Sequence, residues 1–92
     1  MAKMLVDVLS EASNQAVVVM PGRAFPGIVI QGDSLASLSS LASVVRERAG
    51  ACADDDLVEY AVGLSDILGG LLRHYQATLL AAGWRLPYEL PE

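Results

Sequence analysis

The sequence predicts a single α+β domain over residues 1–92, with a three-stranded antiparallel sheet followed by two helices. Three observations predict this class: short alternating or β-branched segments occupy the first third of the chain, two Pro-Gly pairs interrupt them, and helical patterns of leucine and alanine fill the rest. A domain this small buries only about 60–65% of its unfolded surface, so one core must serve the whole chain. We therefore expect both helices to pack on one face of the sheet.

The three strands are expected at about residues 3–9, 15–20 and 27–31. The first alternates apolar and other residues, and the polar stretch SEASNQ (10–15) separates it from the β-branched run of the second. The two Pro-Gly pairs predict turns before the third strand, because proline fixes φ and glycine accepts positive φ. Strands two and three are almost continuously apolar, which predicts burial of both their faces.

The first helix is expected at about residues 33–49. Gly32 lets the preceding strand end sharply, and Asp33 or Ser34 can accept hydrogen bonds from the free N–H groups of a new helix. Gly50 is a suitable C-terminal stop. Apolar residues recur between these signals at helical spacing: Leu35, Leu38, Leu41, Ala42, Val45 and Ala49.

The second helix is expected at about residues 55–82. The acids at 54–56 suit its N-terminus, and Gly83 suits its C-terminus. Apolar residues follow one another at spacings of three and four, close to the heptad pattern of packed helices: Leu57, Ala61, Leu64, Leu68, Leu71, Tyr75, Leu79 and Ala82. Gly69-Gly70 predicts either a kink or break in this helix, or a close approach of a neighbouring helix.

The long helix also predicts self-association. It would be roughly 40 Å long at about 1.5 Å per residue, longer than the short strands can cover. The chain is 53% hydrophobic, and its mean hydropathy is +0.43, so surplus apolar surface is expected on so small a domain. We expect a homodimer or higher homo-oligomer in which part of the long helix packs on another subunit.

Charge and hydropathy patterns limit the partners and the location. The net charge of −5 argues against direct binding to nucleic acid, whose affinity comes mainly from Lys and Arg, but suits a basic protein partner. No apolar run approaches the roughly 20 residues needed to span a bilayer. Asp7 and Glu11 interrupt what would be the hydrophobic region of a signal peptide, so a cytoplasmic location is expected, without membrane association.

No residue pattern predicts catalysis, a metal site or a cofactor. His74 is the single histidine and has no ligand or catalytic partner at helical spacing, and Cys52 is the single cysteine. The acids at 54–56 lack the spread of ligands that a calcium loop needs. We therefore expect a chain that is not an enzyme.

Four side chains are candidates for partner binding. Arg23 and Phe25 lie at the tip of the predicted turns, where an exposed arginine beside an aromatic is typical of a binding hot spot; Phe25 as a core anchor is the competing interpretation. Trp84 and Tyr88 belong to the apolar tail GWRLPYELPE. That tail either packs on its own domain or a dimer mate, or adds to a partner as an edge strand.

Two stretches carry a family resemblance. The block FPGIVIQGDSLASLSSLASVVRE resembles the core of HicB-type antitoxins, and LLAAGWRLPYELP is similar to the ending of that family. The resemblance implies a β-β-β-α core with an additional strand, frequent dimerisation, and binding of a small basic ribonuclease toxin. The chain departs from the family in its long second helix and in lacking a C-terminal DNA-binding segment.

Two functions are therefore predicted. The first is a non-enzymatic protein-binding module of the antitoxin or immunity type, which masks a basic toxin partner. The alternative is a small-molecule-binding or enzymatic domain, whose site forms only at a dimer interface and uses Arg73, His74 or Tyr75.

Overall fold

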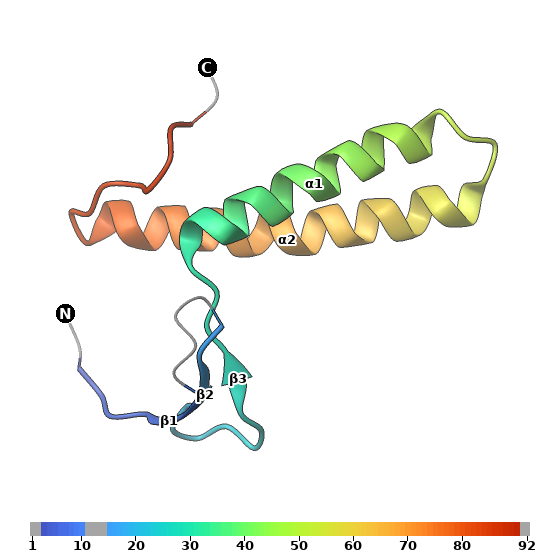
Figure 1. Ribbon diagram of the computed structural model, residues 1–92. Coiled ribbons are helices and arrows are strands. Elements are labelled where there is room, and N and C mark those ends of the chain that lie inside the picture. Colours follow the sequence, from blue (N-terminus) through green and yellow to red (C-terminus); the bar gives the residue numbers. More distant parts are fainter. Residues whose placement is uncertain (1–2, 11–14, 91–92) are drawn as a thin grey trace.

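A computed structural model describes residues 3–10 and 15–90 of the chain (Figure 1). Its elements are β1 (Asp7–Ser10), β2 (Val17–Val19), β3 (Gly27–Ile28), α1 (Gly32–Gly50) and α2 (Asp55–Ala81). The strands form one antiparallel sheet in the order β1-β2-β3, and the two helices form an antiparallel hairpin. The predicted α+β class is confirmed.

The sheet is smaller than the sequence predicts. β1 pairs with β2 through Asp7 opposite Val19, with an irregularity between Val8 and Ser10, and β3 contributes only two residues to the ladder. The turn before β3 follows the Pro-Gly prediction: Gly22 has φ of 78°, and Arg23 N–H donates to the Met20 carbonyl over 3.2 Å. Residues 11–14 of the predicted polar connection lie outside the described residues.

The expected burial of both faces of strands two and three is wrong for the third. Val18 at the centre of β2 is buried, but Ile28 in β3 and Val29 and Ile30 after it are exposed. β3 is an edge strand, and the chain leaves the sheet after Ile28 to enter α1. Its apolar side chains therefore lack a second layer within this chain.

The helix ends follow their sequence signals closely. Asp54 is the N-cap of α2 and its carboxylate accepts from Leu57 N–H at 3.0 Å. At the other end, Gly83 has φ of 79°, and Trp84 N–H donates to the Leu79 carbonyl over 2.9 Å, which satisfies a carbonyl of the last turn. α1 differs from its prediction: it begins at Gly32, one residue early, and its N-cap is Gln31 instead of Asp33 or Ser34, while Asp33 lies in the first turn and accepts from Ser34 N–H.

The Gly69-Gly70 pair does not break α2, which is continuous from Asp55 to Ala81. The interpretation as a close approach of α1 is also wrong within the chain, because an added Cβ at Gly69 would meet only the Arg73 guanidinium. This guanidinium lies one turn further along the same helix. Close approach of another molecule stays a prediction.

Small residues form the contact between α1 and α2. The buried residues of α1 are Gly32, Leu35, Ala42 and Ala49, and the buried residue of α2 is Ala61. Small side chains let two helix backbones approach closely, but each removes little apolar area from water. At Gly32 the approach is so tight that a Cβ would collide with the Tyr75 ring. The hairpin is therefore close-packed but has a thin core.

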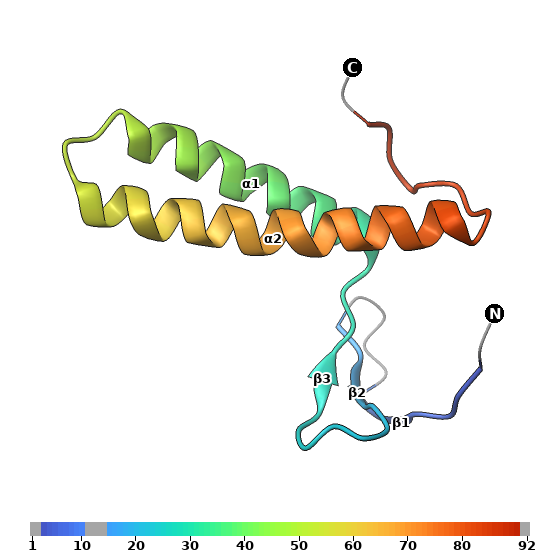
Figure 2. The same ribbon diagram turned by 180° about the vertical axis from the view of Figure 1, so that it is seen from behind.

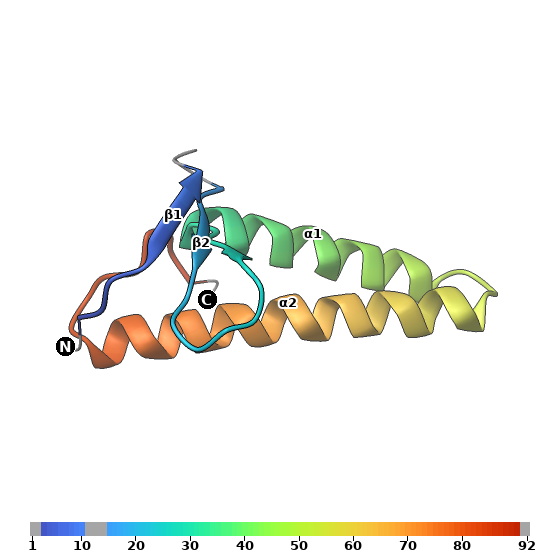
Figure 3. The ribbon, with the colours of Figure 1, turned by 90° about the horizontal axis from the view of Figure 1, so that it is seen from below.

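The predicted packing of both helices on one face of the sheet is wrong. Among the described residues the strands pack on each other and the helices on each other, but no strand packs on a helix. The sheet projects to one side of the hairpin near the start of α1, as Figures 1 and 2 show from opposite directions. From below, the sheet lies at one end of the hairpin and leaves the rest uncovered (Figure 3).

This arrangement leaves the chain extended and unusually exposed. Its radius of gyration is 16.1 Å, whereas a compact domain of this length would have about 12 Å. Its accessible surface is 7516 Å², against about 5,100 Å² for a folded monomer of this mass. The surplus is about 2,400 Å². The described part of the chain thus lacks a layer that a stable globular protein would have.

Gly32→Ala is expected to loosen the start of α1. The new Cβ collides with the Tyr75 ring, so the free energy of unfolding should fall by about 1–3 kcal/mol. Urea unfolding followed by circular dichroism measures this change. Adding Tyr75→Leu should restore most of the loss, and an undiminished effect in the double variant would show that the ring is not the obstacle.

Gly63→Ala is expected to act in the opposite direction. Gly63 lies in the middle of α2, and no atom lies within 4 Å of an added Cβ. Alanine should therefore stabilise the protein by about 0.5–1 kcal/mol through the reduced entropy of the unfolded chain. A lower urea midpoint for this variant would contradict an open position at residue 63.

Candidate functional site

One side of the helical hairpin carries large apolar side chains that no other described residue covers. We call this surface the apolar face. All its residues are exposed, by fractions from 39% at Leu38 to 76% at Tyr60. Three belong to α1 and five to α2: Leu38, Leu41, Val45, Leu57, Tyr60, Leu64, Ile67 and Leu71.

Heptad geometry places these residues on one side. In α2, Leu57, Leu64 and Leu71 are seven residues apart, and Tyr60 and Ile67 follow at the intermediate spacing. The two antiparallel helices are related by a local two-fold axis perpendicular to the plane that contains both helix axes. Rotation about this axis exchanges the helices but keeps every residue on the same side of that plane. Residues displaced in the same angular direction from the α1–α2 contact therefore lie on one side, which places the three α1 residues beside the α2 stripe.

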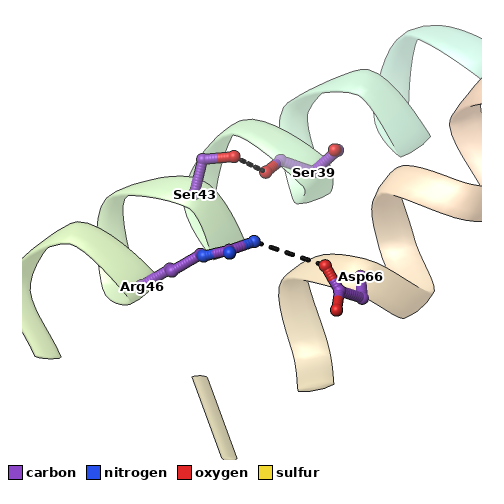
Figure 4. Close-up of polar contacts among 4 residues, drawn as sticks. All are labelled: Ser39, Ser43, Arg46 and Asp66. Carbon is purple, nitrogen blue, oxygen red and sulfur yellow. Dashed lines mark hydrogen bonds and ion pairs between the residues drawn. The ribbon is translucent and has the colours of Figure 1, made fainter. Parts of the chain in front are cut away.

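The opposite side of the hairpin carries more polar residues, although the exposed apolar residues Val44 and Leu80 also lie outside the apolar face. The polar residues are Ser40, Ser43, Glu47, Glu59, Asp66 and Arg73. Across the helix pair, Arg46 Nη1 lies 3.3 Å from Asp66 Oδ1, and on α1 the Ser43 hydroxyl donates a hydrogen bond to the Ser39 carbonyl (Figure 4). Both partners of the ion pair are half exposed or more, and such pairs contribute only about 0.2–1 kcal/mol. The contrast between the sides shows that the apolar face is not a general property of the helix surfaces.

The sheet borders the apolar face at one end. Ile28 and Ile30 share a groove of about 440 Å³ with Leu38 and Leu41 of α1. The groove is open, because all four side chains remain exposed. The sheet and the hairpin thus form two walls of a concave apolar surface.

Arg23 and Phe25 lie in the loop between β2 and β3. Both are exposed, Phe25 by 82%, so the interpretation of Phe25 as a core anchor is wrong for this chain. Pro21 and Gly22 form the turn described above, which begins this loop. An aromatic ring this exposed gains little from the fold and remains available for a partner.

Trp84 and Tyr88 lie in the tail after α2 and have different surroundings. Tyr88 is half-buried, and its hydroxyl oxygen accepts a hydrogen bond from Gln76 Nε2 at 3.0 Å, so the tail folds back on its own helix. The folded tail closes one side of a groove of about 730 Å³, which Leu72 and Val44 also line. Trp84 is 62% exposed.

The structure does not bring the two pairs of predicted residues together. The loop with Arg23 and Phe25 and the tail with Trp84 and Tyr88 lie on opposite sides of the hairpin (Figures 1 and 2). They cannot form one binding patch in a single chain. Any common partner would have to reach around the hairpin.

The residues considered for chemistry do not converge. Arg73, His74 and Tyr75 are consecutive on α2, so they leave the helix at steps of about 100°. Tyr75 lies against Gly32, and Arg73 covers the glycine pair on its own helix. Within residues 3–10 and 15–90, no group of three His, Cys, Asp or Glu side chains could hold a metal ion. Neither described helix is long and apolar enough to cross a membrane.

Sequence reasoning missed the apolar face as a separate surface. The predicted α2 stripe combined residues that face α1, such as Ala61 and Leu68, with exposed ones, such as Leu57 and Leu64. The missed members of α2 are Tyr60 and Ile67. Tyr60 and Ile67 are seven residues apart, and each follows a leucine of the predicted stripe by three residues. This repeat indicates a second line of apolar residues along α2.

Comparisons with known proteins identify a family but no function. Neither curated proteins nor solved structures include a significant match to this chain. The model of one family, described as a family of unknown function (DUF6959), matches residues 1–88. Since this match covers nearly the whole chain, the protein belongs to that family.

Proposed function

We propose that this chain is a non-enzymatic protein-binding module. The observation that carries the proposal is its accessible surface of 7516 Å², about 2,400 Å² above the expectation for a folded monomer of its mass. A partner in a standard complex covers only about 800 Å² per side. The surplus is therefore large enough for more than one protein interface.

The chemistry of the surface favours a basic protein as the partner. The chain carries a net charge of −5, which attracts a basic partner and raises its association rate. Phe25 supplies an exposed aromatic anchor beside β3, and β3 is an edge strand to which an extended segment could add. The loop at residues 20–26 and the β3 edge are therefore the proposed binding surface, with Trp84 as a separate contact on the other side.

The resemblance to HicB-type antitoxins also supports a basic protein as the partner. In that interpretation the chain masks a small basic ribonuclease toxin in the cytoplasm. The additional strand that the resemblance implies is not formed by residues 82–90, which follow α2 without regular structure. The antitoxin role thus rests on the Gln-Gly-Asp-Ser corner and the apolar tail, and the binding role rests on the exposed surface.

The alternative, a small-molecule or enzymatic site at a dimer interface, would need groups from a second chain. His74 is exposed and borders the apolar face, but Arg73 and Tyr75 point elsewhere. Nothing in the described residues favours this alternative over protein binding.

The proposed function predicts recovery of a basic protein on purification from native cells. Tagged chain should retain a small basic protein at low salt and lose much of it as the salt concentration rises. Phe25→Ala should weaken retention by about tenfold or more, because it removes an aromatic anchor. Mass spectrometry and quantitative elution measure both results.

Ser43→Ala is the matched control, because Ser43 lies on the polar side of the hairpin. It should retain the basic protein as the wild type does. Purification that recovers only the chain itself at every salt concentration would count against the proposed function, as would equal losses from Phe25→Ala and Ser43→Ala.

A further inference from the structure

We propose that the apolar face binds a second copy of this chain, so that two helical hairpins form a four-helix arrangement. The face is made by Leu38, Leu41 and Val45 of α1 and by five residues of α2. It adjoins β3 at the groove that Ile28 and Ile30 share with Leu38 and Leu41, but it does not include the loop at residues 20–26. Tests on the purified chain alone therefore distinguish the dimer from the basic complex.

The area that needs cover matches what a stable dimer buries. The surplus surface of about 2,400 Å² belongs to the whole chain, including the sheet and the tail, so only part of it lies on the apolar face. Obligate dimers bury about 2,000–5,000 Å² in total and have interfaces that resemble a domain core cut in half. Even half of the surplus would reach this class. A thin core of small residues inside each hairpin is then completed by large residues between hairpins.

Charge distinguishes a second copy from a basic partner as the occupant. None of the eight residues of the apolar face is charged. A basic protein placed there would find no acid to pair with, and its own lysines and arginines would lose water without compensation. A second copy presents the same uncharged leucines, and a two-fold interface needs such a self-complementary patch.

Charge also selects the relative direction of the two hairpins. Residues 46–59, at the loop end, have a net charge of −3 from two arginines and five acids. The other end of the hairpin carries Asp33, Arg73, Arg85 and Glu89, whose charges cancel. Parallel hairpins would place two acidic ends together. Antiparallel hairpins place each acidic end near a neutral one, and they keep the two sheets at opposite ends.

Leu64 is near the middle of the apolar face, so it provides the sharpest test. Sedimentation equilibrium should give the wild type a mass of about twice 9.7 kDa at micromolar concentration. Leu64→Glu should raise the dimer dissociation constant at least about a hundredfold, because each copy would bury a carboxylate without a partner. Ser43→Glu, which adds the same charge to the polar side, should remain dimeric.

The wild type keeps the proposal testable if Leu64→Glu fails to fold. Its thermal midpoint should rise with protein concentration, because dissociation and unfolding are coupled in such a dimer. A wild type that sediments as a folded monomer at about 100 µM would overturn the proposal. So would a dimer that both glutamate variants weaken equally, since its interface would then lie elsewhere.

Cys52 reports the direction of the hairpins. It is an exposed, free cysteine in the loop between α1 and α2. In the antiparallel dimer the two Cys52 residues lie at opposite ends of the paired hairpins, separated by about the 28 Å length of α1 or more, far beyond disulfide reach. Oxidised wild type should therefore stay free of disulfide-linked dimer on a non-reducing gel. Leu64→Cys in a Cys52→Ser background should cross-link readily, because residue 64 lies near the two-fold axis.

Rapid cross-linking of wild-type Cys52 would overturn the antiparallel arrangement. Failure of the residue 64 variant to cross-link at concentrations where the mass is that of a dimer would place the interface away from the apolar face. Neither result depends on a basic partner, since the purified chain alone is used.

Discussion

The small-residue contact between α1 and α2 is the constraint on which the rest of the structure depends. Gly32, Ala42 and Ala49 are buried along α1, Ala61 is buried on α2, and Gly32 lies against the Tyr75 ring. Such a contact can hold two helices together while removing little apolar area from water. Leu35 is buried in the contact, but the exposed leucines of both helices, such as Leu38 and Leu64, lie beside it. The apolar face is thus a direct consequence of how the hairpin closes.

The sheet does not compensate for this thin core. Its strands are two to four residues long, and a sheet this small is marginally stable without a packed face. Val18 is its one buried hydrophobic side chain among the described residues. Because the sheet projects from the start of α1, the side of the sheet that faces the hairpin and the apolar face border the same space. A second hairpin placed between them would shelter both surfaces at once.

Local signals in the sequence predicted the elements well, because the chemistry that ends a helix or makes a turn acts over a few residues. Asp54 as the N-cap, Gly83 at the end of α2 and the turn at Gly22 all follow from such signals. The packing of helices on the sheet could not be predicted in this way. An apolar stripe shows that a surface needs a partner but does not show which one. The assumption that one core serves 92 residues assigned that partner to the same chain.

The difference between local signals and tertiary packing also explains which parts of the candidate site could be predicted from the sequence. Exposure of Phe25 and Trp84 could be suspected from an arginine-aromatic pair and an apolar tail, but their separation on opposite sides depends on the position of the sheet. The apolar face needed both helices in register, because Leu38 and Leu64 lie far apart in sequence and share a side only through the antiparallel hairpin. The apolar face is therefore a tertiary feature, because its residues share a side only after the two helices pair. The proposed dimer covers this uncharged surface with another copy of the same surface, and the proposed basic partner uses the acidic charge that the dimer leaves exposed.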